Sequence, residues 1–296
     1  MRTILILLIL GGTVEAAALG TPPGPIPVIA SFFPLADFAR GVGGDRVAVR
    51  TLVPAGVEPH DYEARPRDIV ALNRARVVIY NGAGFEPWLQ RVLPQLPDHV
   101  TKVNATEGLP LTRLTTRGSG GVTDPHVWLD PLLAQRQVGL IVAGLSRADP
   151  GGRHAFENNG AGHTAKLDAQ HRRIARALEP CRQKVFVVAH ASFGYFAARY
   201  GLKQIPISGV TPEEEPSAAK MREMLRLARE HRITVIYYET LVSPRVAAAL
   251  AREIGARTLV LNPLEGLTLE EQRLGKDYFT VMDENLRNLR QGLDCP

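Results

Sequence analysis

Residues 156–178, near the middle of the chain, read FENNGAGHTAKLDAQHRRIARAL. This stretch has a helical pattern, but its apolar face is narrow and consists of Leu167, Ile174 and Leu178. Charged residues are frequent on the rest of its surface. A helix that is polar nearly all round often bridges two domains instead of lying in a core. We therefore expect one long charged helix that divides the chain into two halves of similar length.

Short apolar runs rich in β-branched residues lie on both sides of this helix, and most are bounded by turn residues, as is typical of buried parallel strands. They are Val28–Phe33, Val47–Val53, Val77–Tyr80, Val185–Ala189, Ile205–Ile207, Val235–Tyr238 and Thr258–Leu261. Helical patterns alternate with them, at Pro66–Ala75, Leu132–Arg147, Ala218–His231 and Pro244–Ile254. The βαβα order predicts an α/β fold in which helices cover both faces of parallel sheets.

The N-terminus has the plan of a secretory signal peptide. Met1 and Arg2 precede an apolar run, Ile4–Leu10, and small residues follow through Ala18. The run is far shorter than the ~20 residues that a membrane-spanning helix needs. We expect cleavage near residues 16–18 and export of a soluble chain to the periplasm; a buried N-terminal strand is the alternative. No cysteine follows the run, so lipid attachment there is not expected.

Composition and motifs exclude several functions. The net charge of +5 is modest for 296 residues, and no run interleaves basic with aromatic residues, so nucleic acid is not an expected partner. The sequence has no G-x-x-x-x-G-K-[ST], H-E-x-x-H or G-x-S-x-G motif, and we do not expect an enzyme.

Two cysteines are present, Cys181 and Cys295. An oxidising compartment permits their disulfide, but the sequence leaves the pairing open.

Four polar residues are the candidate ligands, and three of them stand beyond the carboxyl ends of predicted strands. His60 lies in VEPHDYE (57–63), His126 in DPHVWLDP (124–131) and Glu265 in NPLEG (262–266), whereas His190 directly follows the run Val185–Ala189. In open parallel sheets, ligands bind beyond the carboxyl ends of the strands. Because two candidates come from each half, they can converge in a cleft between the halves.

Three imidazoles and one carboxylate suit zinc, which takes four N, O or S ligands in a tetrahedron. Manganese, magnesium and calcium favour shells richer in oxygen. Any one of these histidines, taken alone, has the ordinary alternative of a surface residue or a satisfied core residue. The residues alone therefore leave the four-ligand zinc site as one hypothesis.

These blocks, with IASFFPL (29–35) and NPLEGLT (262–268), resemble the metal-binding solute-binding proteins that serve ABC importers, and specifically their zinc branch. The similarity runs from about Pro27 to the C-terminal helix. It implies two α/β lobes, each a parallel sheet flanked by helices, joined by one long linking helix, with the metal between them. We expect a signal peptide at 1–18, lobes at 25–150 and 181–296, and the linking helix at 151–180.

Carried over block by block, the resemblance places the metal ligands at His60, His126, His190 and Glu265. Manganese-preferring relatives tend to have an acidic residue where His190 stands, so His190 favours zinc. We expect a monomeric, high-affinity zinc-binding protein that delivers zinc to the permease of an ABC importer. A manganese-binding member of the family, a secreted zinc-dependent hydrolase with a metal-bound water and an adhesin remain open as alternatives.

Other residues receive more ordinary interpretations. Many zinc members have a histidine-rich loop before the second ligand, but 114–123 contains no histidine, which speaks against a metal-gathering role for it. Asp130 and Glu239 are candidates to accept the second N–H of a ligating histidine, with helix capping as the alternative. The remaining histidines are expected to be solvated on the surface: His99, His154, His163, His171 and His231.

Overall fold

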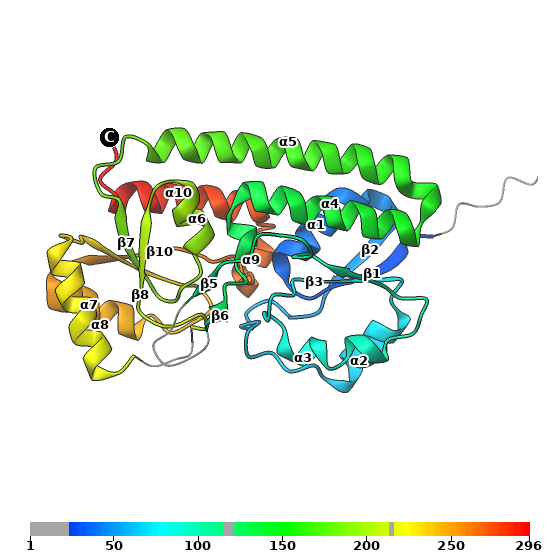
Figure 1. Ribbon diagram of the computed structural model, residues 1–296, viewed down its shortest axis with the longest axis horizontal. Coiled ribbons are helices and arrows are strands. Elements are labelled where there is room, and N and C mark those ends of the chain that lie inside the picture. Colours follow the sequence, from blue (N-terminus) through cyan, green and yellow to red (C-terminus); the bar gives the residue numbers. More distant parts are fainter. Residues whose placement is uncertain (1–23, 115–120, 213–215) are drawn as a thin grey trace, which may run out of the picture.

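A computed structural model describes residues 24–114, 121–212 and 216–296. The expected signal peptide (1–18) and most of the 114–123 loop lie outside the described residues. Across the described ranges, no helix combines the length and hydrophobicity needed to cross a bilayer. Two α/β lobes lie side by side beneath one long helix (Figure 1).

The first lobe is built on four parallel strands in the order β2-β1-β3-β4. They are β1 (Ile26–Ala30), β2 (Val47–Thr51), β3 (Val77–Tyr80) and β4 (Thr101–Asn104). Alternate side chains of β1 enter different cores, Val28 and Ala30 on one face of the sheet and Ile29 on the other. The first core includes α1 (Phe33–Gly43) and α4 (Pro131–Ala148), and the second includes α2 (Pro66–Arg74) and α3 (Pro87–Gln90). The sheet is therefore buried on both faces, as predicted.

The second lobe has four parallel strands in the order β10-β9-β7-β8. They are β7 (Val185–Val188), β8 (Lys203–Pro206), β9 (Val235–Tyr238) and β10 (Arg257–Val260). One face packs on α6 (Gly194–Arg199) and α10 (Tyr278–Gly292), and the other on α7 (Ala218–Glu230) and α8 (Arg245–Ile254). In each sheet the first strand pairs with both the second and the third, and the third with the fourth. The two lobes therefore share one topology.

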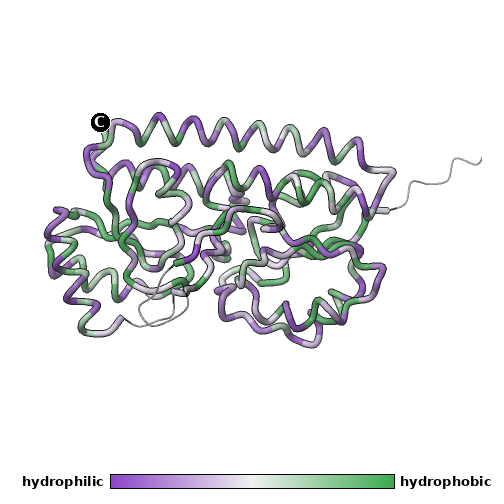
Figure 2. Tube along the Cα trace, viewed as in Figure 1, coloured by the Kyte–Doolittle hydropathy of each residue, from purple (hydrophilic) through white to green (hydrophobic). Residues whose placement is uncertain are grey.

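The linking helix is α5 (Arg153–Leu178), which packs on α1, α4 and α10 and so touches both lobes (Figure 1). Hydrophilic and hydrophobic residues alternate along it in Figure 2. Its buried residues form one stripe, which includes the three predicted apolar positions and also His163. The ring of His163 packs against Phe38 and Phe279, and burial followed by the charge of Lys166 lowers its pKa to about 4. The expectation of a solvated His163 was wrong because the side chain lies on the buried stripe.

Some details differ from the predictions. The first strand ends at Ala30 and not at Phe33, because α1 begins there with Pro34 in its first turn. The structure adds β4, and an antiparallel pair of β5 (Arg113–Leu114) and β6 (Val122–Thr123). The remaining short elements are α9 (Leu269–Arg273) and 3-10 turns at Gly44–Arg46, Leu93–Gln95, Val127–Leu129 and Pro150–Gly152. Cys181 and Cys295 form a disulfide that ties the C-terminus to the chain just after α5.

Candidate metal site

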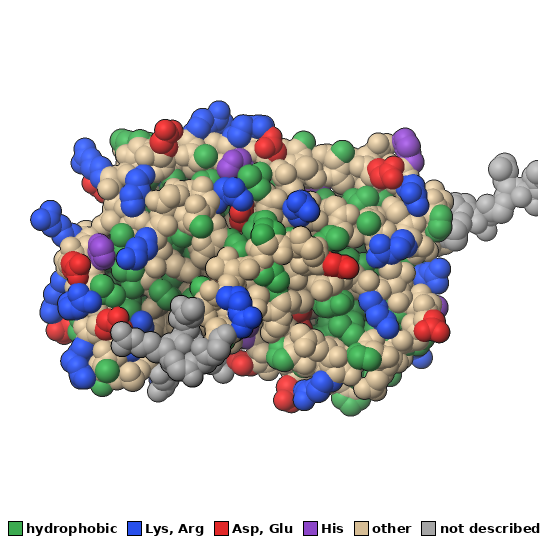
Figure 3. Space-filling model, viewed as in Figure 1, with side chains coloured by type: hydrophobic (Ala, Val, Ile, Leu, Met, Phe, Trp, Pro, Cys, Tyr) green, Lys and Arg blue, Asp and Glu red, His purple; other side chains and the backbone are tan. Residues whose placement is uncertain are grey.

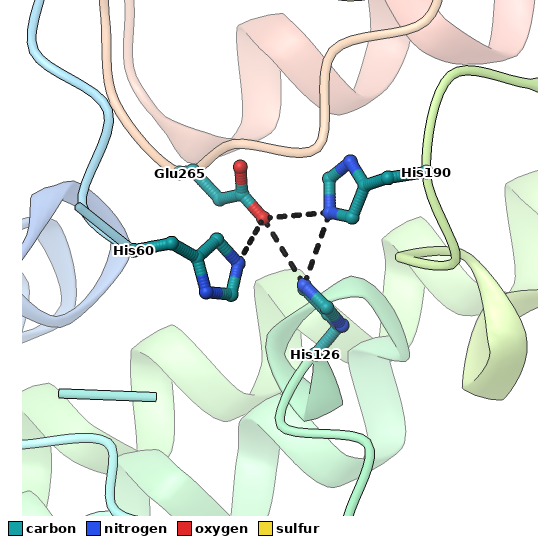
Figure 4. Close-up of side chains that lie close together, drawn as sticks. All are labelled: His60, His126, His190 and Glu265. Carbon is teal, nitrogen blue, oxygen red and sulfur yellow. Dashed lines mark hydrogen bonds and ion pairs between the residues drawn. The ribbon is translucent and has the colours of Figure 1, made fainter. Parts of the chain in front are cut away.

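The structure brings all four predicted residues together between the lobes (Figure 4). The Oε1 atom of Glu265 lies 3.3 Å from Nε2 of His60 and 3.1 Å from Nε2 of both His126 and His190. The Nε2 atoms of His126 and His190 are 3.2 Å apart. All four ligand atoms lie within 4.8 Å of one another, so they surround one point.

Loops at the carboxyl ends of the sheets supply three of these side chains. His60 lies on the loop after β2, His190 two residues after β7, and Glu265 on the loop after β10. His126 instead precedes the 3-10 turn Val127–Leu129, which leads into α4. The predicted convergence beyond the strand ends is therefore observed for three residues, and the fourth comes from the segment that connects β6 with α4.

Two carboxylates orient the histidine rings. Asp124 Oδ1 lies 2.8 Å from Nδ1 of His126, and Glu239 Oε1 lies 2.8 Å from Nδ1 of His190. Holding Nδ1 in this way leaves Nε2 directed at the centre of the site. Glu239 is thus the acceptor that the sequence suggested. Asp130 is not: it accepts a hydrogen bond from the backbone N–H of Leu132 and pairs with Arg199.

Sequence reasoning missed Asp124 and Glu58. Asp124 stands two residues before His126, a spacing at which the carboxylate also accepts the backbone N–H of His126. That short spacing is the signal that could have identified it. Glu58 accepts the backbone N–H of His60, and burial followed by the charge of Glu265 raises its pKa to about 9.

The site is almost closed to solvent. The side chains of His126 and His190 are fully buried, and those of Glu265 and His60 are 1% and 5% exposed. Burial alone lowers the pKa of His190, but the neighbouring Glu239 and Glu265 carboxylates raise it well above its usual value. Burial raises the pKa of Glu265, but the charge of His190 and the hydrogen bonds to the three histidines outweigh it. The pKa of Glu265 is therefore held well below its usual range. The neighbouring carboxylates therefore favour the protonated form of the His190 ring.

At His60, burial has the largest effect on the pKa of the ring and lowers it, although the hydrogen bond to Glu265 acts in the opposite direction. At His126 burial is outweighed by the hydrogen bonds to Asp124 and Glu265, and the pKa is raised.

The first lobe contributes an aromatic wall beside the rings of His60 and His126. Phe85 lies edge-on to His60 with 4.6 Å between ring centroids, and Trp128 lies 5.2 Å from His126 between ring centroids. This wall excludes water from one side of the site.

Four of the six spacings between the ligand atoms fit a tetrahedral zinc ion. Zinc–nitrogen bonds of about 2.0–2.1 Å put neighbouring ligand atoms of a tetrahedron roughly 3.3 Å apart. The four shortest pairs in the site lie at 3.1–3.3 Å. Three nitrogens and one oxygen are also a donor set that zinc accepts in proteins. Among the described residues, no other cluster of histidine, cysteine and acidic side chains has a comparable arrangement.

Comparison with known proteins gives a consistent family. Residues 28–292 match the family described as zinc-uptake complex component A, periplasmic. The chain is 37% identical over 277 residues to the high-affinity zinc uptake system protein ZnuA of Bacillus subtilis, covering 90% of this chain and 87% of that one. It is 36% identical over 282 residues to the zinc-binding lipoprotein AdcA of Streptococcus pneumoniae, but spans only 56% of that longer protein.

A solved structure shows the same fold. The Zn(II)-bound ZnuA-like domain of Streptococcus pneumoniae AdcA superimposes with a TM-score of 0.80 at 37% identity, and the match covers 92% of this chain and all of that domain. The resemblance drawn from the sequence blocks is confirmed. The chain belongs to the ZnuA family, the periplasmic component A of zinc-uptake complexes.

Proposed function

We propose that this protein captures one zinc ion with His60, His126, His190 and Glu265 and delivers it to the permease of an ABC importer. The observation that carries the proposal is the convergence of three Nε2 atoms on one carboxylate oxygen at the edge lengths of a zinc tetrahedron. The relatives ZnuA and AdcA, named for zinc uptake and zinc binding, support the same assignment.

The donor set favours zinc over manganese. Imidazole nitrogens suit zinc, whereas manganese takes more oxygen ligands. The fourth position also favours capture over catalysis. Catalytic zinc sites keep that position for water, and here the Glu265 carboxylate lies within contact distance of all three histidines.

The proposed setting is the periplasm, after removal of the signal peptide at 1–18. The family's periplasmic description supports this setting. We propose a monomer with lobes at 25–150 and 181–296 joined by the linking segment 151–180. On the face shown in Figure 3, Lys and Arg side chains are scattered among acidic ones.

Zinc-edge X-ray absorption on protein loaded with one equivalent of zinc tests the site. The expected spectrum shows four N/O ligands with the multiple-scattering pattern of several imidazoles. A shell of five or six oxygens would contradict the assignment. Delivery is tested in the organism that carries this chain: deleting its gene should abolish high-affinity zinc uptake, and the His126→Ala chain should fail to restore it.

A further inference from the structure

Glu265 is presented by a turn whose backbone is strained. Leu264, the residue directly before it, has φ = 58°, in the left-handed region that a bulky residue rarely adopts. Its side chain is fully buried. Such a conformation persists only where the surroundings hold it. Neighbouring groups must therefore hold the turn Asn262–Glu265 in place.

Restraints within the second lobe act on Asn262. Its side chain accepts the backbone N–H of Leu264 at 2.8 Å. Asn285 of α10 in turn accepts the backbone N–H of Asn262 and donates to its carbonyl. These bonds fix the start of the turn to its own lobe.

Two further restraints come from the first lobe, one on each side of Glu265. The indole Nε1–H of Trp128 donates to the carbonyl of Pro263 at 2.8 Å. The backbone N–H of Gly56, on the loop that carries His60, donates to the carbonyl of Leu267 at 2.8 Å. Of these two bonds, only the one from Trp128 is made by a side chain and can be removed by substitution.

Trp128 is itself firmly held. Its side chain is fully buried, with ring centroids 4.7 Å from Phe32 and 5.0 Å from Phe85. Its own carbonyl accepts a hydrogen bond from the hydroxyl of Tyr278 in α10 at 2.7 Å. It stands two residues after His126, so one rigid segment carries a ligand from the first lobe and holds the turn that carries a ligand from the second.

We propose that Trp128 is a positioning residue for the carboxylate ligand: its indole N–H holds the Pro263 carbonyl and so aims Glu265 at the three histidines. This inference rests on the proposed zinc site. A hydrogen bond between the two ligand-bearing loops fixes their separation, and a tetrahedral shell tolerates little error in that separation. Loss of this bond frees the strained turn, and Glu265 no longer reaches the metal reliably.

The test is a double-mutant cycle with Trp128→Phe and Glu265→Ala, measured as zinc dissociation constants by chelator competition. Trp128→Phe keeps an aromatic ring but removes the N–H, and we expect zinc binding to weaken about tenfold, as for other groups that orient ligands. In the Glu265→Ala background the same substitution should change the constant by no more than about twofold, because the carboxylate it positions is gone. A purely structural role would instead give additive losses.

Tyr237→Phe is the matched control. Tyr237 is also a buried aromatic residue whose polar group donates to a backbone carbonyl, that of Asn288. Its hydroxyl faces α10 and its ring packs on Phe186, and within the described residues no hydrogen bond or ring contact joins it to a candidate ligand. The zinc affinity of the Tyr237→Phe variant should match that of the wild type. If Trp128→Phe does not fold, 3-benzothienylalanine at position 128 replaces the N–H with sulfur in a ring of similar size and should give the same tenfold loss.

The possible outcomes distinguish a failure of the positioning role from a failure of the proposed function. Unchanged zinc affinity in the Trp128 variants, or losses that add to that of Glu265→Ala, overturns the positioning role while the zinc site stands. Failure of the wild type to bind zinc overturns the proposed function instead.

Discussion

At the scale of single residues, His190 has close partners at both of its ring nitrogens. Its Nδ1 faces Glu239, and its Nε2 faces both Glu265 and His126. A hydrogen bond from Nε2 to Glu265 needs a proton on that nitrogen, whereas zinc needs the same nitrogen deprotonated. Metal and proton therefore compete for one atom.

We accordingly expect zinc binding to release protons even at about pH 8, well above the usual imidazole pKa of about 6.5. The pKa values of His190 and His126 are raised, so these rings retain protons that unperturbed histidines have already lost. The pKa of Glu265 is lowered, so this carboxylate releases none. Affinity should thus rise with pH until His190 is deprotonated. Calorimetric titration in two buffers of different ionisation enthalpy measures the release, and equal apparent heats at this pH would contradict it.

Substitution of His190 tests metal preference. His190→Ala should weaken zinc binding by at least about 100-fold, since loss of a group that merely orients a ligand costs roughly 10–100-fold, and it should not improve manganese binding. His190→Asp supplies a hard oxygen ligand and should shift the preference towards manganese. His154→Ala, on the exposed start of α5, is the control and should change neither affinity. Unchanged zinc affinity in His190→Ala would show that the ring is no ligand.

The four candidate ligands could be named from the sequence because each sits in a short recognisable block. Of the groups that hold these side chains in place, the sequence suggested only Glu239. Glu239 is 49 residues from His190, and Trp128 is 135 residues from the carbonyl that it holds. Partners at such separations are set by the tertiary fold, within the second sheet for Glu239 and between the lobes for Trp128, and no local spacing encodes them. Asp124 is the exception, since it acts on His126 from two residues away.

At the scale of elements, helices and strands were predicted best where the apolar pattern of the sequence matches the burial of the element. The strand Val77–Tyr80 has the predicted bounds. The helix α5 begins three residues before the charged stretch 156–178 and lies within the expected linking segment 151–180. The strand β4 was missed because its sequence, TKVN, has one buried residue and lacks an apolar run. The helix α1 was missed because its first residue closes an apolar run that reads as a strand, and only Pro34 marks the change.

The disulfide joins two elements and has a measurable consequence. Cys181 follows α5, and Cys295 follows α10, so the bond closes a loop with a sequence separation of 114 that contains the second sheet. Cys181→Ser/Cys295→Ser should lower the free energy of unfolding by about 2–4 kcal/mol, because cross-linking restricts the unfolded chain. Urea unfolding of the metal-free protein measures this change.

A chemical control accompanies that measurement. The denatured but unreduced wild type should show no thiol that reacts with a labelling reagent, and reduction should expose both. Two reactive thiols before reduction, or equal stability of the double variant, would contradict a bond that stabilises the second lobe.

At the scale of the whole molecule, two sheets of the same topology present their carboxyl-end loops to one shared site. The linking helix packs on both lobes, and hydrogen bonds cross between the lobes beside the ligands, from Trp128 to Pro263 and from Gly56 to Leu267. The sequence predicted α/β lobes from its βαβα order and the linking helix from its charged central stretch. It could not predict the crossing bonds, because these depend on how the lobes are placed relative to each other.

The most direct test of the central claim is a competition titration of the wild-type chain with zinc and manganese against a chromophoric chelator. We expect a single tight zinc site per chain and far weaker manganese binding, because the proposed shell consists of three imidazole nitrogens and one carboxylate. Tighter binding of manganese than of zinc, or two tight zinc sites of equal strength, would contradict it.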